Sequence, residues 1–170
     1  LDAVAAVVEA VPVPVLLKET GCGLDPRTAA AGVARGCAGA DVAGAGGTSW
    51  ARVEALRAAE PSFAAVGDAF RDWGIPAAEA LIAARAALPD AVVIGSGGLR
   101  TGTQLAVAVA LGADAGGLAL PALRALNESD QALDGLLTQI HQELRVAMFC
   151  AGAGDLNALR SGGARRIERP

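Results

Sequence analysis

The stretch VIGSGGLRTG, residues 93–102, joins a β-branched run to two glycines, an arginine and the start of a predicted helix. A glycine lets the backbone approach a ligand that a Cβ would keep away, and the N–H groups at a helix start suit an anion. One interpretation is therefore a phosphate site. The other is a tight turn from strand to helix that holds no ligand, and this stretch alone leaves both open.

The same order of strand, turn and helix repeats along the chain. Short apolar runs predict four strands, over 13–19, 40–46, 91–97 and 113–120. Apolar residues at helical spacing predict helices over 1–11, 26–39, 75–88, 101–112 and 129–145, and a last helical turn over 155–160. The first strand is continuously apolar, which predicts burial on both faces, and residues 46–72 are expected to form a long loop. Strands that alternate with helices indicate an α/β fold with a parallel sheet.

Four βα units amount to half of a (β/α)8 TIM barrel. The tetrapeptides AGAD (38–41) and LGAD (111–114) form the weak internal repeat that a barrel would give, although a doubly wound sheet is also compatible with it. A half-barrel leaves two strand edges that invite pairing with another chain. Either the missing half lies upstream, or the half pairs with itself, or the sheet is open and complete.

The composition favours a folded protein in a reducing compartment. The chain has 170 residues, of which 53% are hydrophobic, and a net charge of −4, so nucleic acid and anionic membranes are poor partners. Three cysteines without CxxC spacing indicate free thiols and a cytoplasmic location. The one histidine, His141, lies in a helical pattern, so no zinc site is expected. The arginine-rich end with Arg165, Arg166 and Arg169 is expected to be solvated.

Six stretches occur in the order and spacing of the type 2 isopentenyl diphosphate isomerases: PVPVLLKETGCG, DVAGAGGTSWARVE, DWGIPAAEAL, GSGGLRTG, LGADAGGLALPAL and ELRVAMFCAGAGDLNALR. These are flavin-dependent (β/α)8 enzymes of isoprenoid synthesis, and the chain resembles only their C-terminal half. DVAGAGGTSWARVE and ELRVAMF are specific, whereas GSGGLRTG is shared with other flavin and phosphate barrels. The resemblance implies that residues 1–170 form a single domain, a half-barrel of strands five to eight that carries the FMN phosphate site.

The resemblance also implies roles for individual residues around FMN. It places Lys18 beside the flavin ring, Thr48 against the cofactor, and Trp50 near the flavin on the substrate side. It assigns the FMN phosphate to two loops, which contribute Gly98, Leu99, Arg100, Ala119 and Leu120.

The chemistry of these residues agrees with such a site. Barrel phosphate sites are built from the loops after strands seven and eight, which here end at 97 and 120, and Arg100 offers a fork of donors for phosphate oxygens. A lysine at a strand end can place a cation beside the flavin. The alternative for Lys18 is a solvent-facing side chain paired with Glu19, and Trp50 could be a loop anchor. Asp41 is interpreted as a residue that starts a strand, rather than as a buried charge near the site.

The early motifs of the family cannot be placed on this sequence, and they contain its acid–base and Mg²⁺-binding residues. The resemblance therefore implies a fragment of an isomerase that converts isopentenyl diphosphate to dimethylallyl diphosphate with reduced FMN and NADPH. It also implies a homo-oligomer in the full-length form, with Mg²⁺ bound outside this chain. Two alternatives remain. One is an FMN-dependent oxidoreductase of the hydroxy-acid oxidase type, against which the absence of a histidine before residue 141 speaks. The other is a non-catalytic half-barrel that binds flavin or phosphate.

Overall fold

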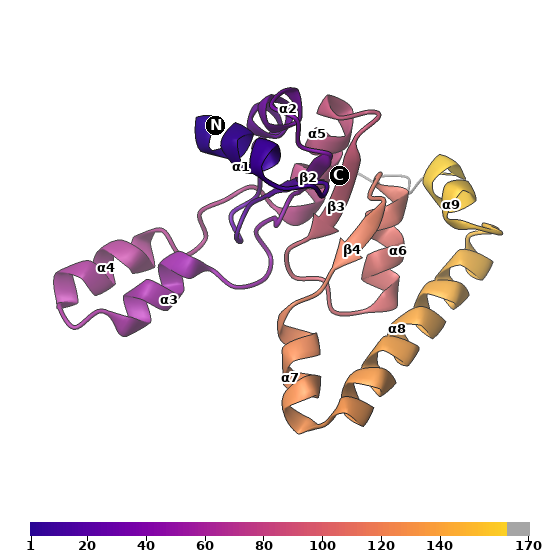
Figure 1. The fold of residues 1–170 in the computed structure, drawn as a ribbon. Coiled ribbons are helices and arrows are strands. Elements are labelled where there is room, and N and C mark those ends of the chain that lie inside the picture. Colours follow the sequence, from indigo (N-terminus) through magenta and orange to yellow (C-terminus); the bar gives the residue numbers. More distant parts are fainter. Residues whose placement is uncertain (163–170) are drawn as a thin grey trace, which may run out of the picture.

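The computed structural model describes residues 1–162, so the arginine-rich end lies outside the described residues. Its centre is a parallel sheet in the order β1-β2-β3-β4 (Figure 1). The strands are short: β1 (Leu16–Lys18), β2 (Gly39–Asp41), β3 (Val92–Ser96) and β4 (Ala115–Gly117). The α/β fold and the four predicted strands are thus confirmed, with boundaries closer together than the apolar runs suggested.

The predicted helices are present as well. They are α1 (Asp2–Ala10), α2 (Pro26–Ala34), α5 (Ala77–Ala87), α6 (Gly102–Ala110), α8 (Asp130–Cys150) and α9 (Leu156–Gly162). Local chemistry sets where they begin. The Asp25 carboxylate accepts the first backbone N–H groups of α2, and the Thr101 hydroxyl accepts the backbone N–H of Gln104 in α6.

The core lies between the sheet and the helices that cover its outer face. Ala40 of β2 and Val93 of β3 are completely buried there, against Ala80 and Ala84 of α5. Small side chains at these positions let the helices approach the strands closely, and burial of this apolar surface stabilises the fold.

The inner face of the sheet is open in the described part of the chain. Leu16 is 37% exposed and Val92 42% exposed, whereas their outward neighbours Leu17 and Val93 pack on the helices. Side chains alternate between the faces of a strand, so this pattern marks a sheet that is covered on one side. The prediction that residues 13–19 are buried on both faces is therefore wrong for this chain, because a half-barrel supplies only one layer of covering.

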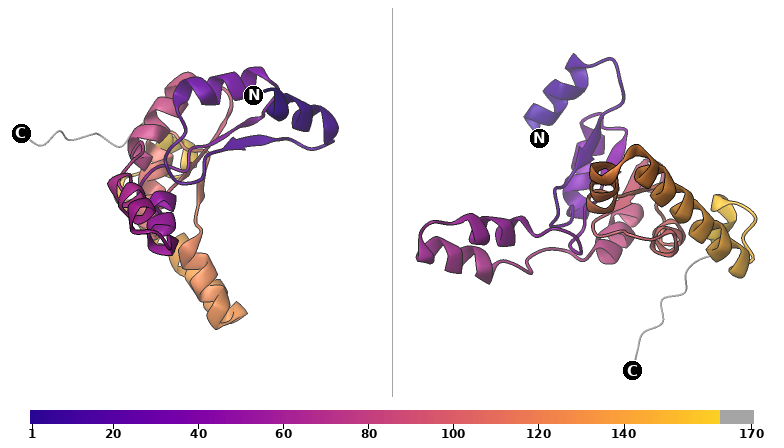
Figure 2. Two further views of the ribbon diagram at one scale, coloured as in Figure 1. Left: turned by 90° about the vertical axis from the view of Figure 1, so that its left-hand side faces the viewer. Right: turned by 90° about the horizontal axis from the view of Figure 1, so that it is seen from below.

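The segment predicted as a loop over 46–72 contains two helices, α3 (Trp50–Arg57) and α4 (Pro61–Ala69). They pack on each other as an arm that projects from the body in Figure 1 and in the right-hand view of Figure 2. Ser49 caps α3, and Pro61 begins α4. Helix α3 has no clear apolar stripe, whereas α4 carries Phe63 and Val66 at helical spacing, so the sequence did hold a signal for α4.

A further helix without a sequence prediction, α7 (Leu120–Glu128), begins directly after β4. It packs on α8, which in turn lies along α6. In Figures 1 and 2, α7 and α8 form a second projection next to the sheet.

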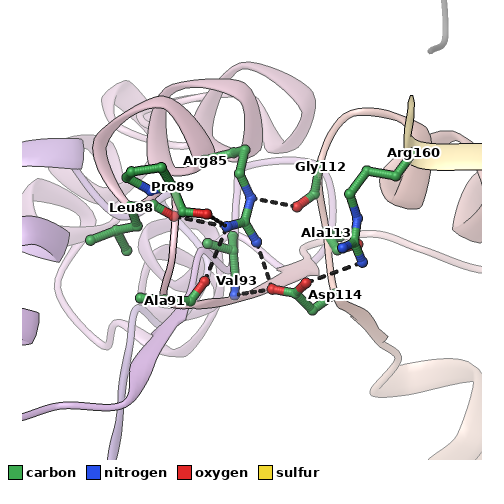
Figure 3. Close-up of polar contacts among 9 residues, drawn as sticks. All are labelled: Arg85, Leu88, Pro89, Ala91, Val93, Gly112, Ala113, Asp114 and Arg160. Atoms are coloured by element: carbon green, nitrogen blue, oxygen red, sulfur yellow. Dashed lines mark hydrogen bonds and ion pairs between the residues drawn. The ribbon is translucent and has the colours of Figure 1, made fainter. Parts of the chain in front are cut away.

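Arg85, Asp114 and Arg160 tie the amino end of the sheet together (Figure 3). Arg85 of α5 donates to the carbonyl oxygens of four residues: Leu88, Pro89, Ala91 and Gly112. It also pairs with Asp114 at 2.5 Å. The Asp114 carboxylate accepts the backbone N–H of Val93 at 2.8 Å and pairs with Arg160 at 3.1 Å. This network therefore joins α5, β3, the residue before β4, and α9.

Candidate functional site

A cavity of about 820 Å³ lies at the carboxyl end of the sheet, where ligands bind in parallel α/β proteins. All the site residues named from the sequence line it: Lys18, Thr48, Trp50, Gly98, Leu99, Arg100, Ala119 and Leu120. They come from segments more than 100 residues apart, and the parallel topology brings them together. Contact of each with a cofactor stays a prediction.

Two glycine loops pack backbone to backbone beside this cavity. Gly97 has φ +104° and Gly98 φ +85°, both in the region that favours glycine. A Cβ at Gly97 would overlap the carbonyl oxygen of Gly44, and one at Gly98 would overlap that of Gly46. Gly97 and Gly98 of the GSGG stretch are thus explained by loop packing, independently of any ligand.

A polar cluster joins the ends of three neighbouring strands at the cavity. The Lys18 ammonium of β1 lies 3.1 Å from the Asp41 carboxylate of β2. The Ser96 hydroxyl of β3 donates to the same carboxylate, which also accepts the backbone N–H of Ala43 at 3.2 Å. The interpretation of Asp41 as a strand start is therefore wrong. It ends β2, only 13% of its side chain is exposed, and it lines the cavity.

Glu19 does not pair with Lys18, in contrast to the alternative considered for that lysine. Its carboxylate turns back and accepts the backbone N–H groups of Gly21 and Cys22 at 2.5 Å and of Gly23 at 3.2 Å. The side chain thus closes the turn that follows β1. Lys18 is left to pair with Asp41 across the strands.

Trp50 acts as a loop anchor and also lines the cavity, while its contact with a flavin stays a prediction. Its indole N–H donates to the carbonyl oxygen of Thr20 at 2.9 Å, which ties the start of α3 to the turn after β1. At the same time it lines the cavity and is 52% exposed. It is an anchor for the arm and a wall of the site.

Another part of the cavity lining is suited to an anion. Arg100 lines the cavity and lends one guanidinium N–H to the Gly98 carbonyl oxygen at 3.2 Å, so further donors of its fork remain. Leu99 packs on the core and also lines the cavity. Helix α7 begins at the cavity with Leu120, and within residues 1–162 no side chain caps it. An uncapped helix start and an arginine together fit a phosphate group.

Helix α7 is the part of the site that sequence reasoning missed. Phosphate sites in TIM barrels often include the start of a short extra helix after the last strand, and α7 begins at the corresponding place. The signal was Pro121, because proline is common in the first turn of a helix.

The fold and the cavity define the class of the protein: an α/β protein built as half of a (β/α)8 barrel, with its cavity at the carboxyl ends of the strands. The sequence matches the FMN-dependent dehydrogenase family over residues 1–166, and the chain belongs to that family. The family supports FMN as the cofactor.

Similar curated proteins carry one name, isopentenyl-diphosphate delta-isomerase. The protein from Stutzerimonas stutzeri is 48% identical over 160 residues, which are 94% of this chain and 46% of that protein. The one from Halobacterium salinarum is 44% identical over 161 residues, 93% of this chain and 44% of that protein. The resemblance stated from the motifs is thereby confirmed, and the chain spans about half the length of these relatives.

Solved structures of mandelate oxidase share the fold. A complex with benzoyl-formic acid matches with a TM-score of 0.71 at 25% identity. The match covers 94% of this chain and 41% of the mandelate oxidase chain. A mutant with a monooxide FMN adduct has a TM-score of 0.68 and covers 44% of its own chain. These matches confirm the half-barrel. Within residues 1–162, no helix is long and apolar enough to cross a membrane.

Proposed function

We propose that the cavity binds FMN and that the chain is the flavin-phosphate half of an enzyme that converts isopentenyl diphosphate to dimethylallyl diphosphate. One observation carries this proposal: the residues that the isomerase motifs assign to the cofactor line one cavity, although they are spread from residue 18 to residue 120. The name shared by the relatives supports the substrate.

In this proposal two parts of the cavity lining hold the two ends of the cofactor. Arg100 and the first backbone N–H groups of α7 bind the phosphate. Lys18 places its ammonium beside the ring, where negative charge collects on reduction. Bound reduced FMN supplies the proton-transfer chemistry of the isomerisation, which moves a double bond without net oxidation.

The remaining partners follow from the resemblance and stay predictions. NADPH is the reductant of the flavin, and Mg²⁺ binds with the diphosphate. Because the family motif that binds Mg²⁺ cannot be placed on this sequence, we place the Mg²⁺ ligand outside this chain. Within residues 1–162 no group of three or more His, Cys, Asp and Glu side chains gathers. A cytoplasmic location and a homo-oligomer belong to the same proposal.

The fold match with mandelate oxidase favours one second candidate, oxidation of a 2-hydroxy acid. Enzymes of that type are expected to place a histidine at the site. The one histidine of this sequence, His141, lies on α8 and is not among the residues that line the cavity. This arrangement favours the isomerase, and a flavin binder without catalysis is the third possibility.

Flavin binding tests the cofactor assignment. We expect the purified chain to bind FMN more tightly than riboflavin, because riboflavin lacks the phosphate, with both affinities followed by flavin fluorescence. Arg100→Ala should weaken FMN binding about tenfold or more and leave riboflavin binding unchanged. Arg57→Ala removes an arginine from the exposed side of α3 and is the matched control. Equal binding of FMN and riboflavin would contradict the phosphate assignment.

Turnover tests the reaction. The chain is combined with the complementary half of the Stutzerimonas stutzeri relative, reduced FMN and Mg²⁺, and offered isopentenyl diphosphate or mandelate. Formation of dimethylallyl diphosphate supports the isomerase. Oxidation of mandelate supports the oxidase, and flavin binding without either reaction supports the non-catalytic binder.

A further inference from the structure

The basic residues of this sequence are strongly biased: there are 14 in all, and Lys18 is the single lysine among them. It stands at the carboxyl end of β1 and lines the cavity. An ammonium on a flexible stem needs a partner to stay in one place, because such a side chain loses more rotamer freedom on ordering than most. The question is what holds Lys18 over the cavity.

Asp41 is placed to do this. Its carboxylate stands on the neighbouring strand, in direct register with Lys18, and lies 3.1 Å from the ammonium. The two side chains differ in environment, since 54% of Lys18 is exposed against 13% of Asp41. The buried partner is thus the fixed one, and the exposed partner is the one that has to be held.

Asp41 is itself held from a third strand. Its Oδ1 atom accepts the Ser96 hydroxyl and the Ala43 backbone N–H, so Oδ2 is left for Lys18. Ser96 is the one buried polar side chain of the described residues, at 9% exposure. A buried charge is costly unless it is paired and hydrogen-bonded, and here both conditions are met by residues at the cavity.

We propose that Asp41, fixed by Ser96, is the positioning residue that holds the Lys18 ammonium over the cavity. The proposal rests on the proposed function, in which Lys18 meets the flavin ring. Asp41 does not touch the cofactor in it. Asp41 acts through the lysine, and the three strand ends behave as one polar unit.

The single lysine permits a direct measurement on the chain without flavin. With ¹³C-labelled lysine, the side chain of Lys18 gives the only lysine signals in an NMR spectrum. We expect separate signals for the two ε protons and slow local motion in the wild type, and averaged signals with fast motion in Asp41→Asn. Asp41→Glu should restore part of the ordering. Asp2→Asn breaks an exposed ion pair with Arg35 and should leave Lys18 unchanged.

A double-mutant cycle on FMN affinity tests the action through Lys18. We expect Lys18→Met and Asp41→Asn each to weaken FMN binding about tenfold, and the double variant to be no weaker than either alone. Ser96→Ala should fall between the wild type and Asp41→Asn in both measurements. Losses that simply multiply in the double variant would show that Asp41 acts on the fold rather than through the lysine.

The two measurements distinguish failure of the cofactor assignment from failure of the positioning role of Asp41. If the wild-type chain does not bind FMN, the cofactor assignment fails, and the NMR signals alone decide whether Asp41 orders Lys18. If FMN binds but Asp41→Asn leaves the Lys18 signals and motion as in the wild type, the positioning role is overturned and the cofactor site stands.

Discussion

Asp114 at the amino end of the sheet and Asp41 at the carboxyl end are both carboxylates held by cations, but in different ways. Two arginines and a backbone N–H saturate Asp114, and Arg85 spends its other donors on carbonyl oxygens (Figure 3). One lysine and one serine hold Asp41, and more than half of the lysine side chain stays exposed. At the amino end of the sheet, Asp114 and its arginines link several elements to one another. At the carboxyl end, the Lys18 ammonium remains partly exposed at the cavity.

The two aspartates end the look-alike tetrapeptides AGAD and LGAD, yet they stand in different registers. Ile94 of β3 pairs with Asp41 on one side and with Ala115 on the other. Asp114 is therefore one residue earlier than the true counterpart of Asp41. Because side chains alternate between faces, a shift of one residue turns a side chain to the other face. The two aspartates of the repeat therefore differ in role: Asp41 lines the cavity, and Asp114 holds the amino end of the sheet together.

The largest expected effect on stability comes from replacing Asp114 at the amino end of the sheet. Asp114→Asn leaves two partly buried arginines without their carboxylate, so we expect the free energy of unfolding to fall by about 3 kcal/mol. Asp41→Asn should cost about 1 kcal/mol, because Lys18 can turn to solvent and the amide oxygen still accepts from Ser96. Urea unfolding followed by circular dichroism measures both.

Glu54→Gln is the control for this pair of variants, since it removes an exposed ion pair with Arg57. It should change the free energy of unfolding by less than about 0.5 kcal/mol. Equal losses for Asp114→Asn and Asp41→Asn would mean that the two ends do not differ as we infer.

The second prediction concerns the backbone of the glycine loop that follows β3, at the carboxyl end of the sheet. Gly97→Ala should lower the free energy of unfolding by about 2 kcal/mol, because φ is +104° and the new Cβ would overlap the Gly44 carbonyl oxygen. Gly154→Ala is the matched control, since a Cβ there has nothing within 4 Å. If both variants unfold at the same urea concentration, the tight packing of the two glycine loops is not required.

Much of this architecture could be predicted from the sequence, because its signals are local. Short apolar runs predicted the four strands, and apolar residues at helical spacing predicted six helices. The resemblance named the residues that line the cavity. The misses have different causes. Helix α3 has no clear apolar stripe, and the place of Asp41 depends on register across strands, so neither leaves a trace in the spacing of residues along one segment. Helix α4 does show apolar residues at helical spacing.

The smallest expected effect comes from a carboxylate held without a cation. Glu143 of α8 accepts the Gln139 side-chain amide at 2.7 Å and the Gly102 backbone N–H at 2.6 Å, and these bonds lower its pKa from the ordinary 4.5. A lowered folded-state pKa stabilises the fold above pH 4.5, and this contribution is lost as the pH falls through the lower value. Glu143→Gln should therefore flatten the acid side of the stability profile measured by urea unfolding, and Gln139→Ala should do so in part. Parallel acid limbs in wild type and Glu143→Gln would show that the start of α6 does not depend on this charge.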